Sequence, residues 1–355
     1  MHERNGIKIL RLEDNFYEEC VNKVLSKFKD EEGIHSIYKF GSISTPGISD
    51  VDLLFVIEPR EKVAERIFNV FETQFSEEEK YVVYQFHPLI LTRDLCPELH
   101  IIRKTTNLIH LWGEKQKFLE LKDIYVKFSQ LIDLLIHYYP GFLIIDNHIH
   151  DHRLGLQYIN AFKYPLALYH DISEKFGLDN APVKETEKVL SLNDLVKTNI
   201  FSYNVDALNE YILDTNKKLF HISGSVKRQI KKFICEKNII VPNKTVKIKR
   251  IADRFFTNRF FQDTHAIKEI NVLVRKTKIY YEPEQFFYFF KEANSLTEQF
   301  REATKKRHNI LAKYTEFTQQ ILGGRNMYSS WWYKNRIDEN IFLKSSYDLL
   351  YLVSG

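Results

Sequence analysis

The stretch from Tyr38 to Val56, YKFGSISTPGISDVDLLFV, constrains the fold more than any other part of the chain. An apolar run ends at Gly41-Ser42, and after a short polar loop Asp50 and Asp52 open a second apolar run. Side chains alternate along a strand, so we expect Asp50 and Asp52 on the same face of it. Neighbouring carboxylates repel each other unless a cation lies between them, and a glycine-serine turn offers backbone N–H groups to an anion. The pattern therefore predicts a site for a metal-bound nucleotide.

The segments around this stretch predict a compact α/β unit. Apolar residues three and four apart predict amphipathic helices, and apolar runs rich in Val, Ile, Tyr and Phe predict strands. The expected helices are residues 15–29 and 61–75, and the expected strands are residues 35–40, 51–57, 80–91 and, more briefly, 99–102. The order is helix, strand, motif, strand, helix, strand.

After Gly113 the hydrophobic period changes to that of helices. Helical spacing covers residues 119–139, 153–176, 206–235 and 283–322. We therefore expect an α+β protein with an N-terminal domain over residues 1–113 and a mostly helical region over residues 114–355, which would bind the substrate or a partner.

Composition excludes some classes of protein and locations. The formal charge of +4 is too small to indicate nucleic-acid binding by itself. Three widely spaced cysteines with no CxxC motif fit a reducing cytoplasm, and the polar N-terminus does not resemble a signal peptide. No apolar run approaches the roughly 20 residues that cross a bilayer, so we expect a cytoplasmic protein without a membrane partner.

The motif G-S-x7-D-x-D, from Gly41-Ser42 to Asp50 and Asp52, resembles the signature of the nucleotidyltransferase superfamily. That superfamily includes DNA polymerase β, the tRNA CCA-adding enzymes and the aminoglycoside nucleotidyltransferases. The fuller pattern GS-x4-G-x-SD-x-D is similar to that of the small bacterial members, and the resemblance covers about residues 14–110. It implies a polymerase-β-like N-terminal domain with a short mixed sheet.

The resemblance also implies a reaction. Two Mg²⁺ ions would bridge the carboxylates of Asp50 and Asp52 and the triphosphate of a nucleotide. Gly41 and Ser42 would hold the β- and γ-phosphates, and Ser49 would orient the loop or a carboxylate. The chain is then expected to be a magnesium-dependent transferase that moves a nucleoside monophosphate from an NTP to a hydroxyl of an unidentified acceptor. ATP is taken as the donor only because it is the commonest one.

One part of the family pattern is not evident, namely a third carboxylate on a following strand. Asp94 and Glu98, in TRDLCPELHII, are the candidates, and we assign Glu98 as the third catalytic acid because it lies nearer a predicted strand, with His100 on the same side. His87 is another polar residue at a strand end. If nothing supplies this acid, the alternative is a weak or inactive member of the fold that binds nucleotide, RNA or a protein partner.

Three other segments carry weaker signals. Residues 225–259 contain eleven Lys and Arg interleaved with Phe, which favours either an RNA or phosphorylated ligand or an ordinary basic surface. Residues 146–152, DNHIHDH, resemble the H-x-H-x-D-H zinc motif but are one residue short, so a polar turn between helices is preferred. Trp331-Trp332-Tyr333 is interpreted as a packing anchor, or less often a stacking platform.

Overall fold

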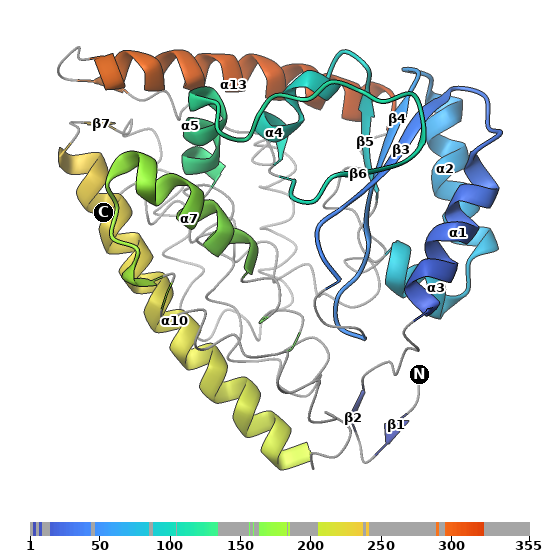
Figure 1. Ribbon diagram of the computed structural model, residues 1–355, viewed down its shortest axis with the longest axis horizontal. Helices are drawn as coiled ribbons and strands as arrows, with labels where there is room; N and C mark the ends of the chain where they lie inside the picture. Colours follow the sequence, from blue (N-terminus) through green and yellow to red (C-terminus); the bar gives the residue numbers. More distant parts are fainter. Residues whose placement is uncertain are drawn as a thin grey trace, which may run out of the picture.

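The computed structural model shows a mixed α and β protein (Figure 1). It describes residues 3–4, 7–8, 15–43, 47–84, 88–103, 105–133, 156, 159, 163–182, 184, 205–236, 239–240, 289–290 and 295–322. Among these residues, no helix is both long and apolar enough to cross a membrane.

The elements of the first part of the chain surround a small sheet. After a short hairpin of β1 (Glu3–Arg4) and β2 (Ile7–Lys8), they are α1 (Phe16–Phe28), β3 (Ile34–Phe40), β4 (Asp52–Ile57), α2 (Glu61–Gln74), α3 (Glu77–Val83), β5 (Leu89–Thr92), a 3-10 turn (Cys96–Glu98), α4 (Leu99–Ile102) and β6 (Ile109–Gly113). The later elements are α5 (Ile124–Asp133), α7 (Lys163–Phe176), α10 (Val205–Glu236), α13 (Ser295–Gln320) and the paired β7 (Ile239–Ile240) and β8 (Phe289–Phe290).

The sheet is mixed, with the strand order β5-β4-β3-β6. Strand β3 is antiparallel to both β4 and β6, whereas β4 and β5 are parallel. Phe40, the last residue of β3, pairs with Asp52, the first residue of β4. The intervening loop therefore starts and ends at the same end of these two central strands, which brings Gly41 close to Asp52.

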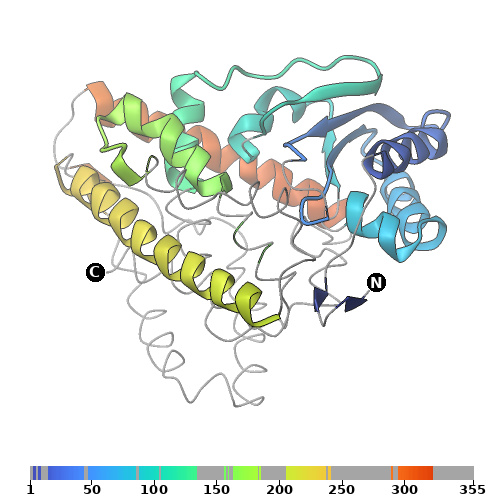
Figure 2. The same ribbon diagram turned by 60° about the horizontal axis from the view of Figure 1, so that its bottom comes forward.

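Both faces of the central strands are covered. In β4 every residue after Asp52 is buried, and a strand buried on both faces reads as a continuous apolar run. Helices α1, α2 and α3 lie on one side of the sheet, and α4 and α13 lie on the other (Figures 1 and 2). On the first side the rings of Phe28, Phe55 and Phe71 pack together, with centroids 5.1 Å apart for Phe28 and Phe55.

Helix α13 shares its core with the sheet although it comes much later in the chain. Ile310 and Phe317 of α13 and Val126 of α5 belong to the same hydrophobic cluster as β3 and β4. Residues on both sides of the expected boundary at 113–114 therefore contribute to one core. Figure 1 shows α13 passing over α5 and α4 towards the sheet.

Two of the predicted strands are wrong. Residues 80–91 do not form a single strand, because α3 continues to Val83 and β5 begins only at Leu89. A capping box starts α3, in which Glu79 N–H donates to Ser76 Oγ and Ser76 N–H donates to Glu79 Oε2. Residues 99–102 form the short helix α4 instead of a strand. Strand β6 was not among the predicted elements.

The helices predicted after Gly113 are found over most of the described residues, but two parts of the predicted ranges are wrong: residues 119–123 precede α5 and are not helical, and Phe289–Phe290 form strand β8. The helices appear as α5, as α7 with Pro165 in its first turn, as the single long helix α10, and as α13 beginning at Ser295. Residues 134–155, 185–204, 241–288 and 323–355 lie outside the described set. The mostly helical character of the whole C-terminal region thus stays a prediction.

Candidate functional site

Gly41 lies directly against the carboxylate of Asp52. It follows the end of β3 with φ +79°, a left-handed conformation that L side chains rarely adopt. A β-carbon at this position would lie 3.0 Å from Asp52 Oδ2. The Gly41 N–H donates a 2.8 Å hydrogen bond to the carbonyl of Thr106. Glycine is therefore needed here both for the turn and for the close approach to the acid.

The carboxyls of Asp50 and Asp52 repel each other. Burial, together with the charge of Asp52, raises the pKa of Asp50 to about 8, against weaker opposing effects of a backbone hydrogen bond and Arg103. Burial also raises the pKa of Asp52, and the charge of Arg103 opposes that rise. The two acids therefore interact, as the sequence pattern predicts, and a further positive charge between them would be strongly favourable.

Arg103 supplies a positive charge close to the pair. Its Nη2 lies 3.7 Å from Asp52 Oδ1, and its guanidinium lies over the ring of Phe40, 5.5 Å from the centroid. The Arg103 and Asp52 side chains are 22% and 27% exposed, so this contact is only partly screened by water. Sequence reasoning missed Arg103, because a chain position fifty-one residues after Asp52 gives no local signal.

Two buried tyrosines hold the loop that carries Asp50. The Tyr17 hydroxyl of α1 accepts the N–H of Gly47 at 2.9 Å and donates to the carbonyl of Ser49 at 2.6 Å. The Tyr81 hydroxyl of α3 donates to the Gly47 carbonyl at 2.8 Å. Burial raises the pKa of Tyr17, so its hydroxyl keeps the proton that it donates. Sequence reasoning missed both tyrosines; the only available signal was the high aromatic content.

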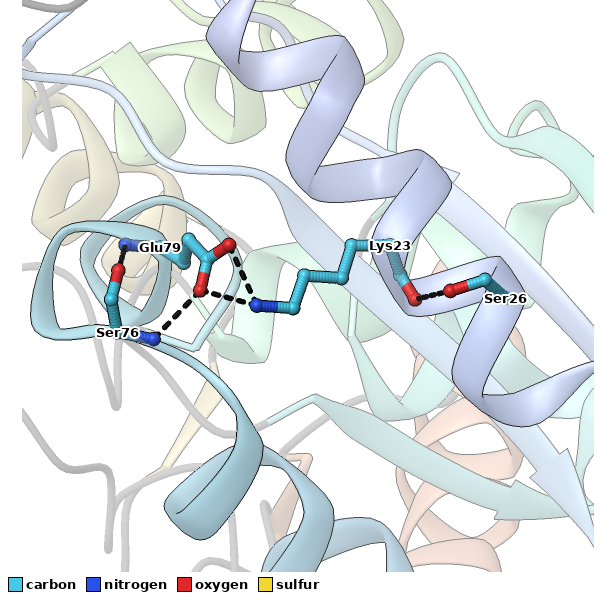
Figure 3. Close-up of polar contacts among 4 residues, drawn as sticks. All are labelled: Lys23, Ser26, Ser76 and Glu79. Carbon is cyan, nitrogen blue, oxygen red and sulfur yellow. Dashed lines mark hydrogen bonds and ion pairs between the residues drawn. The ribbon is translucent and has the colours of Figure 1, made fainter.

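An ion pair fixes the two helices that carry these tyrosines. Lys23 of α1 donates to both carboxylate oxygens of Glu79 on α3, at 2.8 and 2.7 Å, while Glu79 also accepts the Ser76 N–H (Figure 3). Burial alone would raise the pKa of Glu79, but the hydrogen bonds from Lys23 and Ser76 outweigh it and lower that pKa. Glu79 therefore stays ionised at neutral pH, and the pair links α1 to α3 beside the loop.

The serines of the motif lie in different environments. Ser42 is exposed, and Ser49 is buried with its carbonyl bonded to Tyr17. Because the Gly41 N–H is engaged with Thr106, Ser42 is the member of the predicted Gly41-Ser42 pair that offers exposed groups to a phosphate in this conformation. The roles predicted for Gly41, Ser42 and Ser49 in nucleotide binding stay predictions.

The candidates for the third acid have partners of their own. Asp94 accepts a hydrogen bond from Thr92 Oγ1, and Glu98 Oε2 lies 3.7 Å from Lys306 Nζ. Both acids follow the last residue of β5, Thr92, which pairs with Ile57. Ile57 is the last residue of β4, whereas Asp52 is the first, so β5 ends beside the end of β4 that is away from Asp52. In the part of the chain that the structure describes, no group of three or more His, Cys, Asp or Glu side chains could hold a metal ion. His87 lies outside the described residues, and the catalytic role of Glu98 stays a prediction.

Asp50 and Asp52 are the residues that could hold a metal. Mg²⁺ takes oxygen ligands and is commonly bound through one or two carboxylates together with the phosphates of a substrate. Two adjacent acids whose pKa values are raised by burial fit that requirement, because a divalent cation would relieve both burial and repulsion. The donor set therefore suits a magnesium–nucleotide complex.

The other predicted sites fall largely outside the described residues. This applies to residues 146–152, to residues 331–333 and to all of the basic segment 225–259 beyond the end of α10 at Glu236, apart from β7. An RNA or phosphorylated partner for the basic segment stays a prediction.

Comparison with known proteins does not assign this chain to a family. No family model, curated protein or solved structure matches the chain. The function is therefore inferred from Gly41, Asp50, Asp52 and the segments that position them.

Proposed function

We propose that this chain is a magnesium-dependent nucleotidyltransferase that moves a nucleoside monophosphate from an NTP, with ATP as the first donor to test, to a hydroxyl of an acceptor molecule. The observation that carries this proposal is the close approach of Asp52 to Gly41, together with the repulsion between Asp50 and Asp52. A β-carbon on Gly41 would lie 3.0 Å from Asp52 Oδ2, and the charge of Asp52 raises the pKa of Asp50.

The sheet supports this assignment. The loop between antiparallel β3 and β4 returns Asp52 to a position opposite Phe40, so the glycine-serine turn and Asp52 meet at one end of these two strands. A phosphate held at the turn would then lie next to a metal held by the acids. This is the arrangement that the resemblance to nucleotidyltransferases implies for a polymerase-β-like domain.

Each residue has a defined part in the proposed reaction. Bound magnesium would supply charge neutralisation for the triphosphate and for the leaving pyrophosphate. Asp50 and Asp52 would hold the metal-bound nucleotide, and the exposed Ser42 would bind phosphate oxygens. The acceptor hydroxyl releases its proton to solvent and its oxygen forms a bond to the α-phosphorus, while the bond from that phosphorus to the bridging oxygen breaks and pyrophosphate leaves.

The direct test is the release of pyrophosphate from each of the common NTPs with Mg²⁺, with cell extract as the source of acceptor. An α-³²P-labelled nucleotide would mark the acceptor. We expect labelling by the native chain and none by Asp50→Asn or Asp52→Asn. Asp30→Asn, which removes an exposed acid just after α1, is the matched control and should label normally. Labelling that survives Asp50→Asn would rule out the proposed site.

A second candidate function is nucleotide binding without turnover. The observation in its favour is that Glu98 is paired with Lys306 and Asp94 with Thr92, so neither acid is committed to the Asp50–Asp52 pair. The test is to measure Mg–ATP binding alongside pyrophosphate release in native protein and in Glu98→Gln. Binding without release in the native protein would favour this function. Release that depends on Glu98 would favour the enzyme and assign the third acid.

A further inference from the structure

The 99–106 segment, of which the structure describes residues 99–103 and 105–106, contacts both halves of the candidate site. Arg103 of this segment lies 3.7 Å from Asp52, and the carbonyl of Thr106 accepts the N–H of Gly41. The position of this segment therefore decides where a positive charge lies beside Asp52 and how the glycine turn is held.

The segment is anchored from the far side by Arg307 of α13. Arg307 is 1% exposed, and its Nη1 donates to the carbonyl of Ile101 at 2.7 Å and also to Ser129 Oγ. The Ser129 hydroxyl in turn donates to the same Ile101 carbonyl at 2.9 Å. Ile101 belongs to α4, and its carbonyl is one of those that a helix leaves without an internal partner at its C-terminal end. A buried cation therefore caps α4 two residues before Arg103.

Such a contact is more specific than ordinary packing. Burying a guanidinium is costly unless hydrogen bonds compensate it, and an apolar side chain would fill the same space without that cost. What Arg307 adds is a directional bond to one backbone carbonyl. The bond joins positions that are 206 residues apart in the chain. It therefore fixes the position of α13 relative to α4 directly, through a tertiary contact.

We propose that Arg307 is a positioning residue of the candidate site: by holding the Ile101 carbonyl it sets where segment 99–106 places Arg103 and the Thr106 carbonyl, and hence the geometry at Asp52 and Gly41. This proposal rests on the proposed function for its consequence in nucleotide binding, but its structural part is independent of that function. It makes α13 a required part of the site.

The structural part is tested by native-state hydrogen exchange. The variants are Arg307→Met and the conservative Arg307→Lys, and Lys305→Met is the matched control because it removes an exposed charge from the same helix. We expect Arg307→Met to speed exchange of the Gly41 amide about tenfold while the amides of β4 keep their native rates. Arg307→Lys should restore part of the protection, and Lys305→Met should change nothing.

Two exchange results would overturn the proposal. Equal acceleration at Gly41 and in β4 would mean that Arg307 contributes only general stability, and unchanged exchange at Gly41 would mean that it does not act on the turn. If Arg307→Met fails to fold, Arg307→Lys decides, because it keeps a buried cation but replaces the guanidinium that bonds both the Ile101 carbonyl and Ser129 Oγ. In Arg307→Lys, faster exchange confined to Gly41 and its neighbours supports the proposal, and native exchange there contradicts it.

The functional part is tested by Mg–ATP binding to the same variants below their unfolding temperatures. We expect Arg307→Met to bind Mg–ATP about tenfold more weakly, the lower range for losing an outer partner of a metal site, and Lys305→Met to bind normally. Native affinity in folded Arg307→Met would overturn the link to the site. If the native chain binds no Mg–ATP, the proposed function fails, whereas the exchange experiment still decides the role of Arg307.

Discussion

The Asp52 carboxylate lies so close to Gly41 that a β-carbon on the glycine would be 3.0 Å from Oδ2. The relationship links the two halves of the motif, which are far apart along the loop but adjacent in the sheet because Phe40 pairs with Asp52. It also explains why the turn must be glycine, since its φ of +79° is strained for any L side chain.

Gly41→Ala should therefore impair ligand binding as well as stability. The left-handed conformation alone should cost about 1–2 kcal/mol of unfolding free energy, and the new methyl should also push Asp52 Oδ2 aside. Gly177→Ala is the matched control, because Gly177 has φ +69° but its added methyl would meet nothing within 4 Å. Urea unfolding should show that Gly41→Ala is at least as destabilising as Gly177→Ala, and Mg–ATP titration should show weaker binding for Gly41→Ala alone. Equal binding by the two variants would contradict the role given to this contact.

The raised pKa of Asp50 predicts a pH-dependent stability. The pKa rises from 3.8 to about 8 on folding, so between these values the folded chain keeps a proton that the unfolded chain has released. This group should therefore lower the stability of the metal-free protein as pH rises from about 4 to about 8, and add no further change above that. The side chain of Asp50→Asn cannot ionise. The unfolding free energy of this variant, relative to that of the native protein, should therefore increase as pH rises across this range.

Urea unfolding without divalent ions, at about pH 5 and about pH 8, measures that difference. Asp30→Asn, which removes an exposed carboxyl, is the control. Parallel profiles for native protein and Asp50→Asn would show that the Asp50 carboxyl is not held in the unfavourable environment described here.

The parts of the fold that were predicted correctly have a regular spacing of apolar residues along the chain. Helices α1 and α2 and strands β3 and β4 lie within two residues of the expected ranges, because apolar spacing fixes each of them without help from distant residues. The error over residues 80–91 has a local cause. Tyr, Val and Phe favour strands there, but the capping box of Ser76 and Glu79 starts a helix, and its S-x-x-E signal was present in the sequence.

The candidate site also has features that the local sequence predicts and others that only tertiary packing supplies. The closeness of Gly41 to Asp52 and the interaction of Asp50 with Asp52 could be predicted, because these residues lie on one loop whose spacing is meaningful by itself. Tyr17 and Arg103 could not, since they reach the loop and Asp52 only through the packing of α1 and α4. A pattern confined to one stretch of chain cannot reveal a partner that tertiary structure supplies.

The pair formed by Lys23 and Glu79 should stabilise the protein at neutral pH and lose that effect in acid. The folded-state pKa of Glu79 lies below its usual value of 4.5, so its contribution is present above that pH and disappears as pH falls through the folded pKa. Glu79→Gln should cost about 1–2 kcal/mol at neutral pH, because it weakens a cap and a charged hydrogen bond. Glu61→Gln, an exposed acid in the first turn of α2, is the control. A cost for Glu79→Gln that does not shrink in acid would contradict the assignment.

The buried Tyr17 hydroxyl should contribute far more to the unfolding free energy than an exposed tyrosine hydroxyl. Tyr17→Phe leaves the buried N–H of Gly47 and carbonyl of Ser49 without their partner, which should cost about 1–3 kcal/mol. Tyr125→Phe makes the same chemical change at an exposed hydroxyl bonded to Glu302, and should cost less than about 0.5 kcal/mol. Because Tyr17 holds the loop before Asp50, only Tyr17→Phe should also weaken Mg–ATP binding, measured below its unfolding temperature. A lower unfolding free energy with unchanged Mg–ATP binding would show that the Tyr17 hydroxyl supports the fold without positioning the acids.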